Sequence, residues 1–263
     1  MRQWTSFAGI AITALLALFL VVPVLLSVYA GLTVNYARGF SAGFTLEWVR
    51  QVWELYADTV WRSLVVALLT LMLTLLIGVP GAYALVRNGG RFARAVEEIV
   101  TLPVAVPGLA LALALILSYG GFGAFRQSTL FVVVGHVLFT LPFMMRSVIA
   151  VFDTIDWRTL DEGAASLGSP VWRRFIDVIL PNVRPGIVAG ALTVVTLSIG
   201  EFNLTWMMHT PMTKTLPVGL ADAYASMRLE IASAYTIVFL IMVIPLLIGL
   251  QTIAGLTEKR TKS

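Results

Sequence analysis

Four stretches of this chain run for more than 20 residues without one charged side chain. They cover residues 7–29, 64–86, 99–119 and 234–256. An α-helix needs about 20 consecutive apolar residues to cross the hydrocarbon core of a bilayer, so each stretch predicts a transmembrane helix. Only 12% of all residues are charged, about half of the roughly 25% that is typical of a soluble domain. We therefore expect an all-α, polytopic membrane protein.

Two further stretches, residues 130–152 and 187–208, are apolar but hold ionisable side chains. The first contains His136 and Arg146, and the second contains Glu201. An ionisable group inside a bilayer is costly and by default suggests a functional site. We expect both stretches to span, which gives about six transmembrane helices in a single domain over residues 1–263. The alternative is that one stretch is a buried interfacial segment.

The first apolar stretch is expected to be a permanent helix rather than a signal peptide. It is longer than the roughly 7–15 apolar residues of a signal peptide, and no small-residue cleavage site follows it. Prolines do not argue against the spans, because neighbouring membrane helices satisfy the carbonyls that a proline leaves free. Pro23, Pro80, Pro107, Pro142 and Pro245 lie inside these stretches.

The lysines and arginines predict the orientation of the chain. With the N-terminus in the cytoplasm, twelve of the eighteen lie in cytoplasmic segments or at the inner end of a span. Cytoplasmic loops of membrane proteins carry an excess of Lys and Arg. We therefore expect both termini in the cytoplasm, in agreement with an even number of spans. The net charge of +4 then reflects membrane topology. No DNA-binding motif accompanies it, so no nucleic-acid partner is expected.

The longest cytoplasmic segment, residues 153–185, predicts a helix–turn–helix. Its first helix covers about residues 157–167. Leu160, Ala164 and Leu167 fall on one side of that helix. Gly168 suits the end of the helix because glycine readily adopts the left-handed backbone found there.

The second helix of this segment is expected to begin after Gly168. Ser169 can cap it and Pro170 suits its first position. Pro181 is expected to end the helix, and its apolar stripe consists of Val171, Phe175, Val178 and Ile179. Small side chains beside the turn would let another protein surface approach closely. From the residues alone, the alternative is an ordinary connection lying on the membrane.

The motif in this segment resembles the EAA loop of bacterial ABC importer permeases. Glu162-Gly163-Ala164 is followed by Gly168 and then by the run Val178-Ile179-Leu180-Pro181. The family pattern is Glu-Ala-Ala, three residues, Gly, nine residues and Ile-x-Leu-Pro. The spacing matches, while Gly163 replaces an alanine and Val178 replaces an isoleucine. The six-span layout extends the resemblance over almost the whole chain.

The resemblance implies a type I ABC importer permease with a cytoplasmic coupling helix–turn–helix. The expected partners are two copies of an ABC ATPase, a second permease (a copy or a paralogue), a periplasmic or surface-anchored solute-binding protein, and membrane lipid. The location implied is the bacterial inner membrane. The residues expected to couple to the ATPase are Glu162, Gly163, Ala164, Ala165, Gly168, Ser169, Leu180 and Pro181.

The chain is not expected to be an enzyme. A nucleotide-binding loop of the Walker type needs Gly-Lys followed by Ser or Thr. The chain's lysines are Lys214, Lys259 and Lys262, and none of them follows a glycine. No catalytic constellation is recognisable, so no catalytic residue and no cofactor is assigned to this chain. ATP and Mg are expected on the partner ATPase.

Glu201 is the most informative residue inside a predicted span. One interpretation places Glu201, Asn203 and Thr205 along the translocation path. The other makes Glu201 a structural carboxylate that bonds neighbouring helix ends or pairs with an arginine. His136 has no other ligand-type residue at suitable spacing, so we expect a hydrogen-bonded structural histidine and no metal site.

The substrate is not readable from the sequence. The chain is similar overall to permeases for polyamines, phosphonates, ferric iron and thiamine, and we lean to the spermidine/putrescine type. The rival class is a stand-alone secondary transporter or channel. Such transporters are usually built from internal repeats, and no clear repeat between the two halves is visible.

Overall fold

The computed structural model describes the backbone of residues 2–261 and the side chains of residues 9–39 and 41–252. The regular secondary structure of this part of the chain is helical, with loops and turns between the helices and one isolated antiparallel bridge between Thr33 and Phe44. Within the described residues, four helices are long and apolar enough to cross a membrane, and two bent helix pairs raise the number of candidate spans to as many as six. The all-α, polytopic fold expected from the sequence is confirmed.

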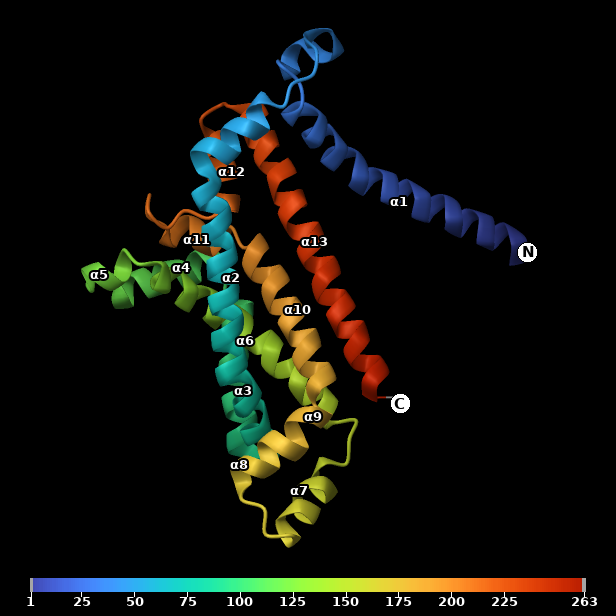
Figure 1. Ribbon diagram of the computed structural model, residues 1–263, viewed down its shortest axis with the longest axis vertical. Helices are drawn as coiled ribbons and strands as arrows, with labels where there is room; N and C mark the ends of the chain where they lie inside the picture. Colours follow the sequence, from blue (N-terminus) through green and yellow to red (C-terminus); the bar gives the residue numbers. More distant parts are fainter. Residues whose placement is uncertain (1, 262–263) are drawn as a thin grey trace. The chain divides into compact units, whose positions relative to one another are not determined.

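Figure 1 labels most of the helices along the chain. η1 is a 3₁₀-helix and η2 is a π-helix. In order, the elements are α1 (Arg2–Gly31), η1 (Tyr36–Ala42), α2 (Glu47–Asn88), α3 (Gly90–Ala105), α4 (Gly108–Tyr119), α5 (Gly123–Arg126), α6 (Thr129–Phe152), α7 (Trp157–Ser166), α8 (Val171–Arg173), η2 (Arg174–Ile179), α9 (Leu180–Asn182), α10 (Arg184–Gly200), α11 (Asn203–Met208), α12 (Leu216–Ala225) and α13 (Leu229–Thr261).

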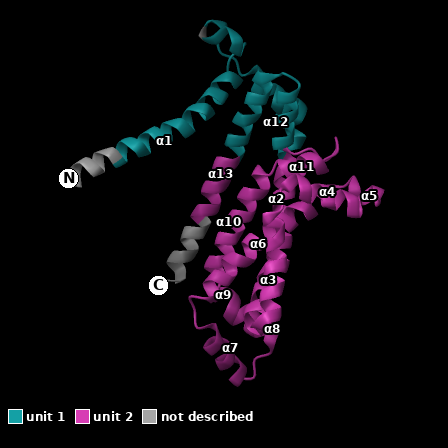
Figure 2. Ribbon diagram, turned by 180° about the vertical axis from the view of Figure 1, so that it is seen from behind, with its two compact units in different colours: residues 1–60, 216–242 teal, residues 61–215, 243–263 magenta. Residues whose placement is uncertain are grey.

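The chain divides into two compact units (Figure 2). The first comprises Met1–Val60 and Leu216–Met242, and the second comprises Trp61–Thr215 and Val243–Ser263. Helices α2 and α13 each contribute residues to both units. The candidate sites described below lie within the second unit.

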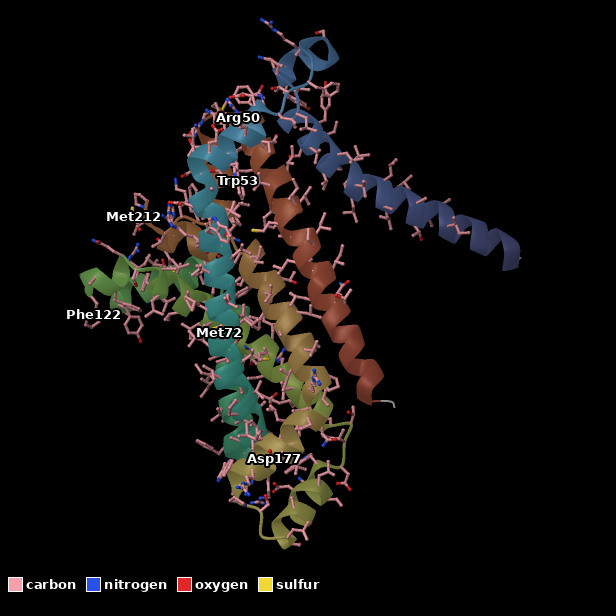
Figure 3. All side chains as sticks on the ribbon, in the orientation of Figure 1. Arg50, Trp53, Met72, Phe122, Asp177 and Met212 are labelled. Carbon is pink, nitrogen blue, oxygen red and sulfur yellow. The ribbon has the colours of Figure 1, made fainter. Side chains whose placement is uncertain are left out.

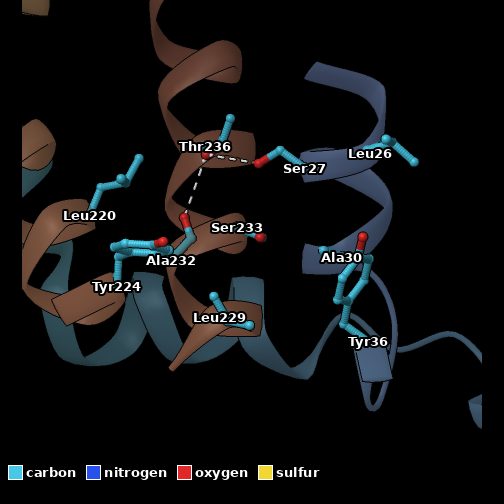
Figure 4. A pocket seen from close by; sticks show the side chains of 10 residues that line it. All are labelled: Leu26, Ser27, Ala30, Tyr36, Leu220, Tyr224, Leu229, Ala232, Ser233 and Thr236. Carbon is cyan, nitrogen blue, oxygen red and sulfur yellow. Dashed lines mark hydrogen bonds between the residues drawn. The ribbon is translucent and has the colours of Figure 1, made fainter. Parts of the chain in front are cut away.

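In the first unit, the end of α1 lies close to α13. A Cβ atom on Gly31 would lie 2.8 Å from the backbone nitrogen of Ala234, so only glycine permits this approach. Ser27 Oγ donates a hydrogen bond to Thr236 Oγ1 at 3.2 Å. This bond lies beside a pocket of about 270 Å³ that α1, η1, α12 and α13 line (Figure 4).

In the second unit, α6 and α10 pack closely because two glycines one helical turn apart remove the side chains between them. A Cβ on Gly186 would lie 2.5 Å from the carbonyl oxygen of Ser147, and one on Gly190 would lie 3.2 Å from Met144 Cα. Small residues at this spacing let membrane helices approach. The packing buries Met144, Val148 and Val194 in a shared apolar core.

The third predicted span, residues 99–119, is not one straight helix. Helix α3 ends at Ala105, α4 begins at Gly108, and the two helices are bent by 108°. Val106 and Pro107 adopt extended backbone between them. The expectation that Pro107 lies inside a helix is therefore wrong. Proline has no N–H to donate and restricts the residue before it to extended conformations, which favours a break here.

The fifth predicted span, residues 187–208, is also interrupted. Helix α10 ends at Gly200, Glu201 has extended backbone with φ −70° and ψ 122°, and α11 begins at Asn203. Gly200 weakens the helix because glycine has low helix propensity. The Glu201 side chain then bonds the start of the next helix instead of continuing α10. The other four prolines expected inside spans, Pro23, Pro80, Pro142 and Pro245, do lie inside helices.

Candidate functional site

Helix α7 is bounded by capping groups at both ends. Asp156 caps its start by accepting hydrogen bonds from Thr159, at 2.7 Å from Oγ1 and 3.4 Å from the backbone N–H. These two bonds lower the pKa of Asp156 below its ordinary value. Its carboxylate also has the charge that a helix N-terminus favours. A helix of ten residues is marginal alone, so these caps help to fix where α7 begins.

The turn after α7 is a Schellman motif. Gly168 has φ +77°, as the sequence predicted. The N–H of Gly168 donates to the carbonyl of Ala165 at 2.9 Å, and the N–H of Ser169 donates to Ala164 at 3.1 Å. This pair of bonds satisfies carbonyls at the end of the helix. The left-handed residue and the two bonds together hold the turn in one conformation.

The second half of the segment differs from the expected single α-helix. Pro170 is the N-cap of α8, so neither the Ser169 cap nor Pro170 at the first helical position is correct. Residues 174–179 form a π-helix between two single α-turns. Pro181 does not end the helical run, because it lies at the start of α9, where a missing N–H is tolerated. The chain instead bends by 74° around Val183 before α10 begins.

Helix α7 does not bury Leu160 and Leu167, which fall on one side of it. Leu160 is 38% exposed and Leu167 is 90% exposed, while the buried residue of α7 is Asp161. Beside Asp161, Trp157 packs edge-on against Phe152 with ring centroids 6.1 Å apart. The side of α7 that carries these two leucines is therefore largely on the outside. We attribute this to the burial of the polar Asp161, whose partners lie outside the helix.

Asp161 makes the contacts that fix α7 to the rest of the second unit. Arg174 Nη1 donates to Asp161 Oδ2 at 3.0 Å, and the Tyr83 hydroxyl donates to Oδ1 at 3.1 Å. Sequence reasoning missed Asp161, Arg174 and Tyr83. The sequence feature that could have pointed to Asp161 is the acidic pair Asp161-Glu162, because one carboxylate of such a pair can bond to the same chain while the other faces outward. Within the described residues, no hydrogen bond or ion pair is found for the exposed carboxylate of Glu162.

The predicted coupling residues surround the turn. Glu162, Gly163, Ala165 and Gly168 are exposed, and Ala164 and Ser169 are half-buried. A Cβ at Gly163 or Gly168 would meet nothing within 4 Å. Leu180 and Pro181 lie apart from this group and line an open apolar groove of about 580 Å³. The other residues that line it are Leu75, Leu76, Val79, Pro80, Phe175, Arg184 and Ile187.

Glu201 bonds the start of α11. Its Oε1 accepts a hydrogen bond from the Leu204 N–H at 2.8 Å, and its Oε2 accepts bonds from the Thr205 N–H and hydroxyl at 2.9 Å each. A Cβ on Gly108 would lie 3.6 Å from Oε1, so the carboxylate also lies near the N-terminus of α4. Helix N-termini carry partial positive charge and favour a carboxylate. Helix-end bonding is one of the two arrangements that the structural interpretation of Glu201 allows.

His136 is buried beside Glu201 and is hydrogen-bonded at both ring nitrogens. Nδ1 lies 2.8 Å from Ser198 Oγ, and Nε2 lies 2.8 Å from Thr205 Oγ1. The histidine on α6 thereby joins α10 to α11, as expected for a structural histidine. Asn203, the remaining residue of the predicted translocation path, is exposed. Among the described residues, no three His, Asp or Glu side chains are placed to hold a metal ion.

Comparison with known proteins identifies the family of this chain. Residues 74–263 match the family described as binding-protein-dependent transport system inner membrane component. The molybdenum transport system permease protein ModB of Azotobacter vinelandii is 30% identical over 181 residues, which cover 63% of this chain and 80% of that protein. The permease protein PhnV of Salmonella paratyphi A, named for 2-aminoethylphosphonate transport, is 26% identical over 249 residues, 94% of each chain.

The fold is also found among solved structures. A chain of a bacterial ABC transporter involved in the import of the acidic polysaccharide alginate superposes with a TM-score of 0.74. The match covers 97% of this chain and 96% of that one at 16% identity. A chain of the MetNI methionine ABC transporter gives a TM-score of 0.63 at 19% identity, covering 80% of this chain and 97% of that one.

Together, the helical fold and the family match define a membrane-embedded transport subunit. The chain belongs to the family of binding-protein-dependent transport system inner membrane components. It is a permease subunit of a binding-protein-dependent ABC importer and a multi-pass protein of the inner membrane. It is not itself the ATPase. This membership decides against the stand-alone transporter or channel.

Proposed function

We propose that residues 157–182, which we call the coupling segment, dock on the ATP-binding subunit and transmit its movement to the spans. The observation that carries this proposal is the exposure of large apolar side chains around a rigid turn. Leu167 is 90% exposed, Trp172 is 59% exposed and Ile176 is 49% exposed. These side chains lie in the segment that joins two spans, and exposed apolar patches mark interaction sites. Charged residues such as Asp177 (Figure 3) lie beside them.

In this proposal two copies of the ATPase bind and hydrolyse ATP with Mg, and each docks on one permease. A second permease, either a copy of this chain or a paralogue, completes the pathway. The predicted residues from Glu162 to Ser169 form the part of the docking surface closest to the turn. Closure of the ATPases moves the coupling segments and switches the pair of permeases between inward-open and outward-open states. Both termini then lie in the cytoplasm, on the side of the ATPases.

Docking can be tested by purifying the complex through a tag on the permease. Leu167→Glu places a charge in the exposed apolar patch and should reduce the amount of ATPase that co-purifies. Met212→Glu is the matched control, because Met212 is similarly exposed (71%) and lies outside the coupling segment (Figure 3). Equal ATPase recovery with both variants would contradict docking at this patch.

The transported solute is proposed to be a small oxygen-rich anion, such as a phosphonate or a molybdate-like oxyanion. The full-length match is to a permease named for an aminoethylphosphonate, and another relative is named for molybdenum. The bonding of Glu201 supports an anion over a polyamine. Its carboxylate already accepts three hydrogen bonds, so it is poorly placed to bind a cation.

The substrate proposal is tested on the cognate binding protein. Its thermal unfolding is measured with 2-aminoethylphosphonate, molybdate, sulfate, spermidine and putrescine. A ligand at about 100 times its Kd stabilises a protein by about 2.7 kcal/mol, which shifts the unfolding temperature measurably. Stabilisation by one of the anions supports the proposal. Stabilisation by a polyamine alone would restore the spermidine/putrescine interpretation.

A further inference from the structure

Three buried polar side chains join the coupling segment to a membrane span within the second unit. Asp161 lies on α7, Arg174 on η2 and Tyr83 on α2. One carboxylate oxygen of Asp161 accepts from Arg174 at 3.0 Å, and the other accepts from the Tyr83 hydroxyl at 3.1 Å. Arg174 also donates to the backbone carbonyl of Asp161 at 3.3 Å. We propose that Asp161 is a positioning residue that transmits displacement of α7 to α2 through Tyr83.

The burial of these groups makes their contacts hard to exchange for water. Asp161 is 7% exposed and Tyr83 is 6% exposed, and the Arg174 side chain is 11% exposed. Removing one partner of a buried pair leaves the other charge uncompensated, so the pair is held together strongly. Asp161 and Arg174 therefore move as one body, which fixes α7 to η2 across the turn.

The ring of Tyr83 is held from several sides, which fixes the direction of its hydroxyl. Its centroid lies 5.1 Å from that of Phe175 and 6.2 Å from that of Phe152. The Arg87 guanidinium lies 5.8 Å from the ring centroid. Aromatic contacts of this kind restrict ring orientation and add to the apolar packing. When Asp161 moves, Tyr83 therefore cannot keep the hydrogen bond by rotating its side chain alone, so its helix α2 is displaced as well.

Helix α2 has a point at which it can yield to this displacement. Pro80 lies inside α2, three residues before Tyr83. A proline removes one backbone hydrogen bond from a helix, and sharp bends concentrate at such positions. Pro80 also lines the open groove between α2 and the residues of η2, α9 and α10. Displacement at Tyr83 is therefore expected to bend α2 at Pro80, into or away from that groove.

This inference rests on the proposed docking of the coupling segment. The test uses the whole importer, reconstituted with its ATPase and binding protein, and measures the solute imported per ATP hydrolysed. Tyr83→Phe removes the hydroxyl that donates to Asp161, and Asp161→Asn replaces its charged acceptor with a neutral amide, which weakens that bond. Tyr119→Phe and Glu98→Gln are matched controls, because both side chains are exposed and lie on α4 and α3.

We expect import per ATP to fall about fivefold in each variant, the fold-change that corresponds to one hydrogen bond. The ATPase should still co-purify and hydrolyse ATP. The double variant should be no worse than the more severe single variant, because both changes act on the same Asp161–Tyr83 contact. Three results would overturn the inference. The first is a double variant in which the two losses of import per ATP multiply. The second is import per ATP equal to that of the controls in both single variants, and the third is a loss of bound ATPase with no other effect.

The Gly168→Val variant separates this inference from the proposed function. If Gly168→Val uncouples import while Tyr83→Phe and Asp161→Asn behave like their controls, docking stands and the Asp161 link is wrong. If Gly168→Val also imports normally with the ATPase bound, the docking proposal itself is wrong.

Discussion

Oε2 of Glu201 accepts hydrogen bonds from both the backbone N–H and the hydroxyl of Thr205, each at 2.9 Å. The carboxylate of Glu201, which lies in a predicted span, therefore caps the start of α11. The hydroxyl of Thr205 also lies 2.8 Å from His136 Nε2. The polar groups at the break between α10 and α11 are thus bonded mainly to one another.

Replacing Glu201 should therefore reduce stability more than transport. Glu201→Ala removes the acceptor of two helix N–H groups and should cost about 1–3 kcal/mol. Glu201→Gln keeps one carbonyl oxygen and should cost less. Thermal unfolding of the purified permease measures the loss, and uptake is normalised to the amount of assembled complex. Normal stability of Glu201→Gln with strongly reduced normalised uptake would instead support a place on the translocation path.

The contact between α6 and α10 should tolerate no side chain at Gly186. The added methyl of Gly186→Ala would lie 2.5 Å from Ser147 O, so the helices must separate. Overpacking of this kind typically costs about 1–3 kcal/mol. Gly249→Ala is the matched control, because a Cβ there meets nothing within 4 Å and alanine favours helix by about 0.5–1 kcal/mol. Equal unfolding temperatures for the two variants would contradict the packing described.

The spans were predictable because a helix that lies in a bilayer must be apolar over its whole length. Charge-free runs of about 20 residues mark them, and no tertiary information is needed. The left-handed Gly168 was predictable for the same reason, since a glycine after a short helix is itself a local signal. The breaks near Pro107 and Glu201 were not, because apolar sequence continues on both sides of each break.

The tie between α7 and α2 could not be read from the sequence. Asp161 lies 13 residues before Arg174 and 78 residues after Tyr83. A carboxylate in a charged loop is usually solvated, and only the fold shows that this one is buried. The same burial explains why the side of α7 with Leu160 and Leu167 is outside. Helical periodicity shows that these leucines share one side, but it does not show that Asp161 takes the buried position.

Acidification should weaken the start of α7. The hydrogen bonds from Thr159 lower the pKa of Asp156 below its ordinary value of 3.8. The folded segment thus favours the ionised carboxylate. Its stabilising effect is complete above that ordinary value and is lost as the pH falls through the lowered pKa. Hydrogen exchange of the first turn of α7, corrected for intrinsic rates, should be slower in the wild type than in Asp156→Ala at neutral pH. This difference should disappear in strong acid; a difference that persists unchanged would contradict the assigned cap.

The proposed orientation can be checked with single cysteines, because the natural chain contains none. Arg91 and Met212 are both exposed, and they lie on opposite sides of the membrane in the proposed topology. A membrane-impermeant maleimide added to intact cells should label Met212→Cys and leave Arg91→Cys unlabelled until the cells are opened. The reverse pattern would place both termini outside.

The strongest prediction concerns Gly168, because its φ of +77° is compatible with few other residues. A left-handed backbone costs an L-residue roughly 1–2 kcal/mol, least for asparagine. Uptake should therefore be reduced least in Gly168→Asn, more in Gly168→Ala and most in Gly168→Val, whose side chain is β-branched. Insertion into the membrane should stay normal in all three variants. Gly121→Val is the control, since Gly121 has open space and no positive φ. Uptake, ATP hydrolysis and co-purification are measured on the same preparations. Wild-type uptake by Gly168→Val with the ATPase bound would mean that the turn only connects two helices.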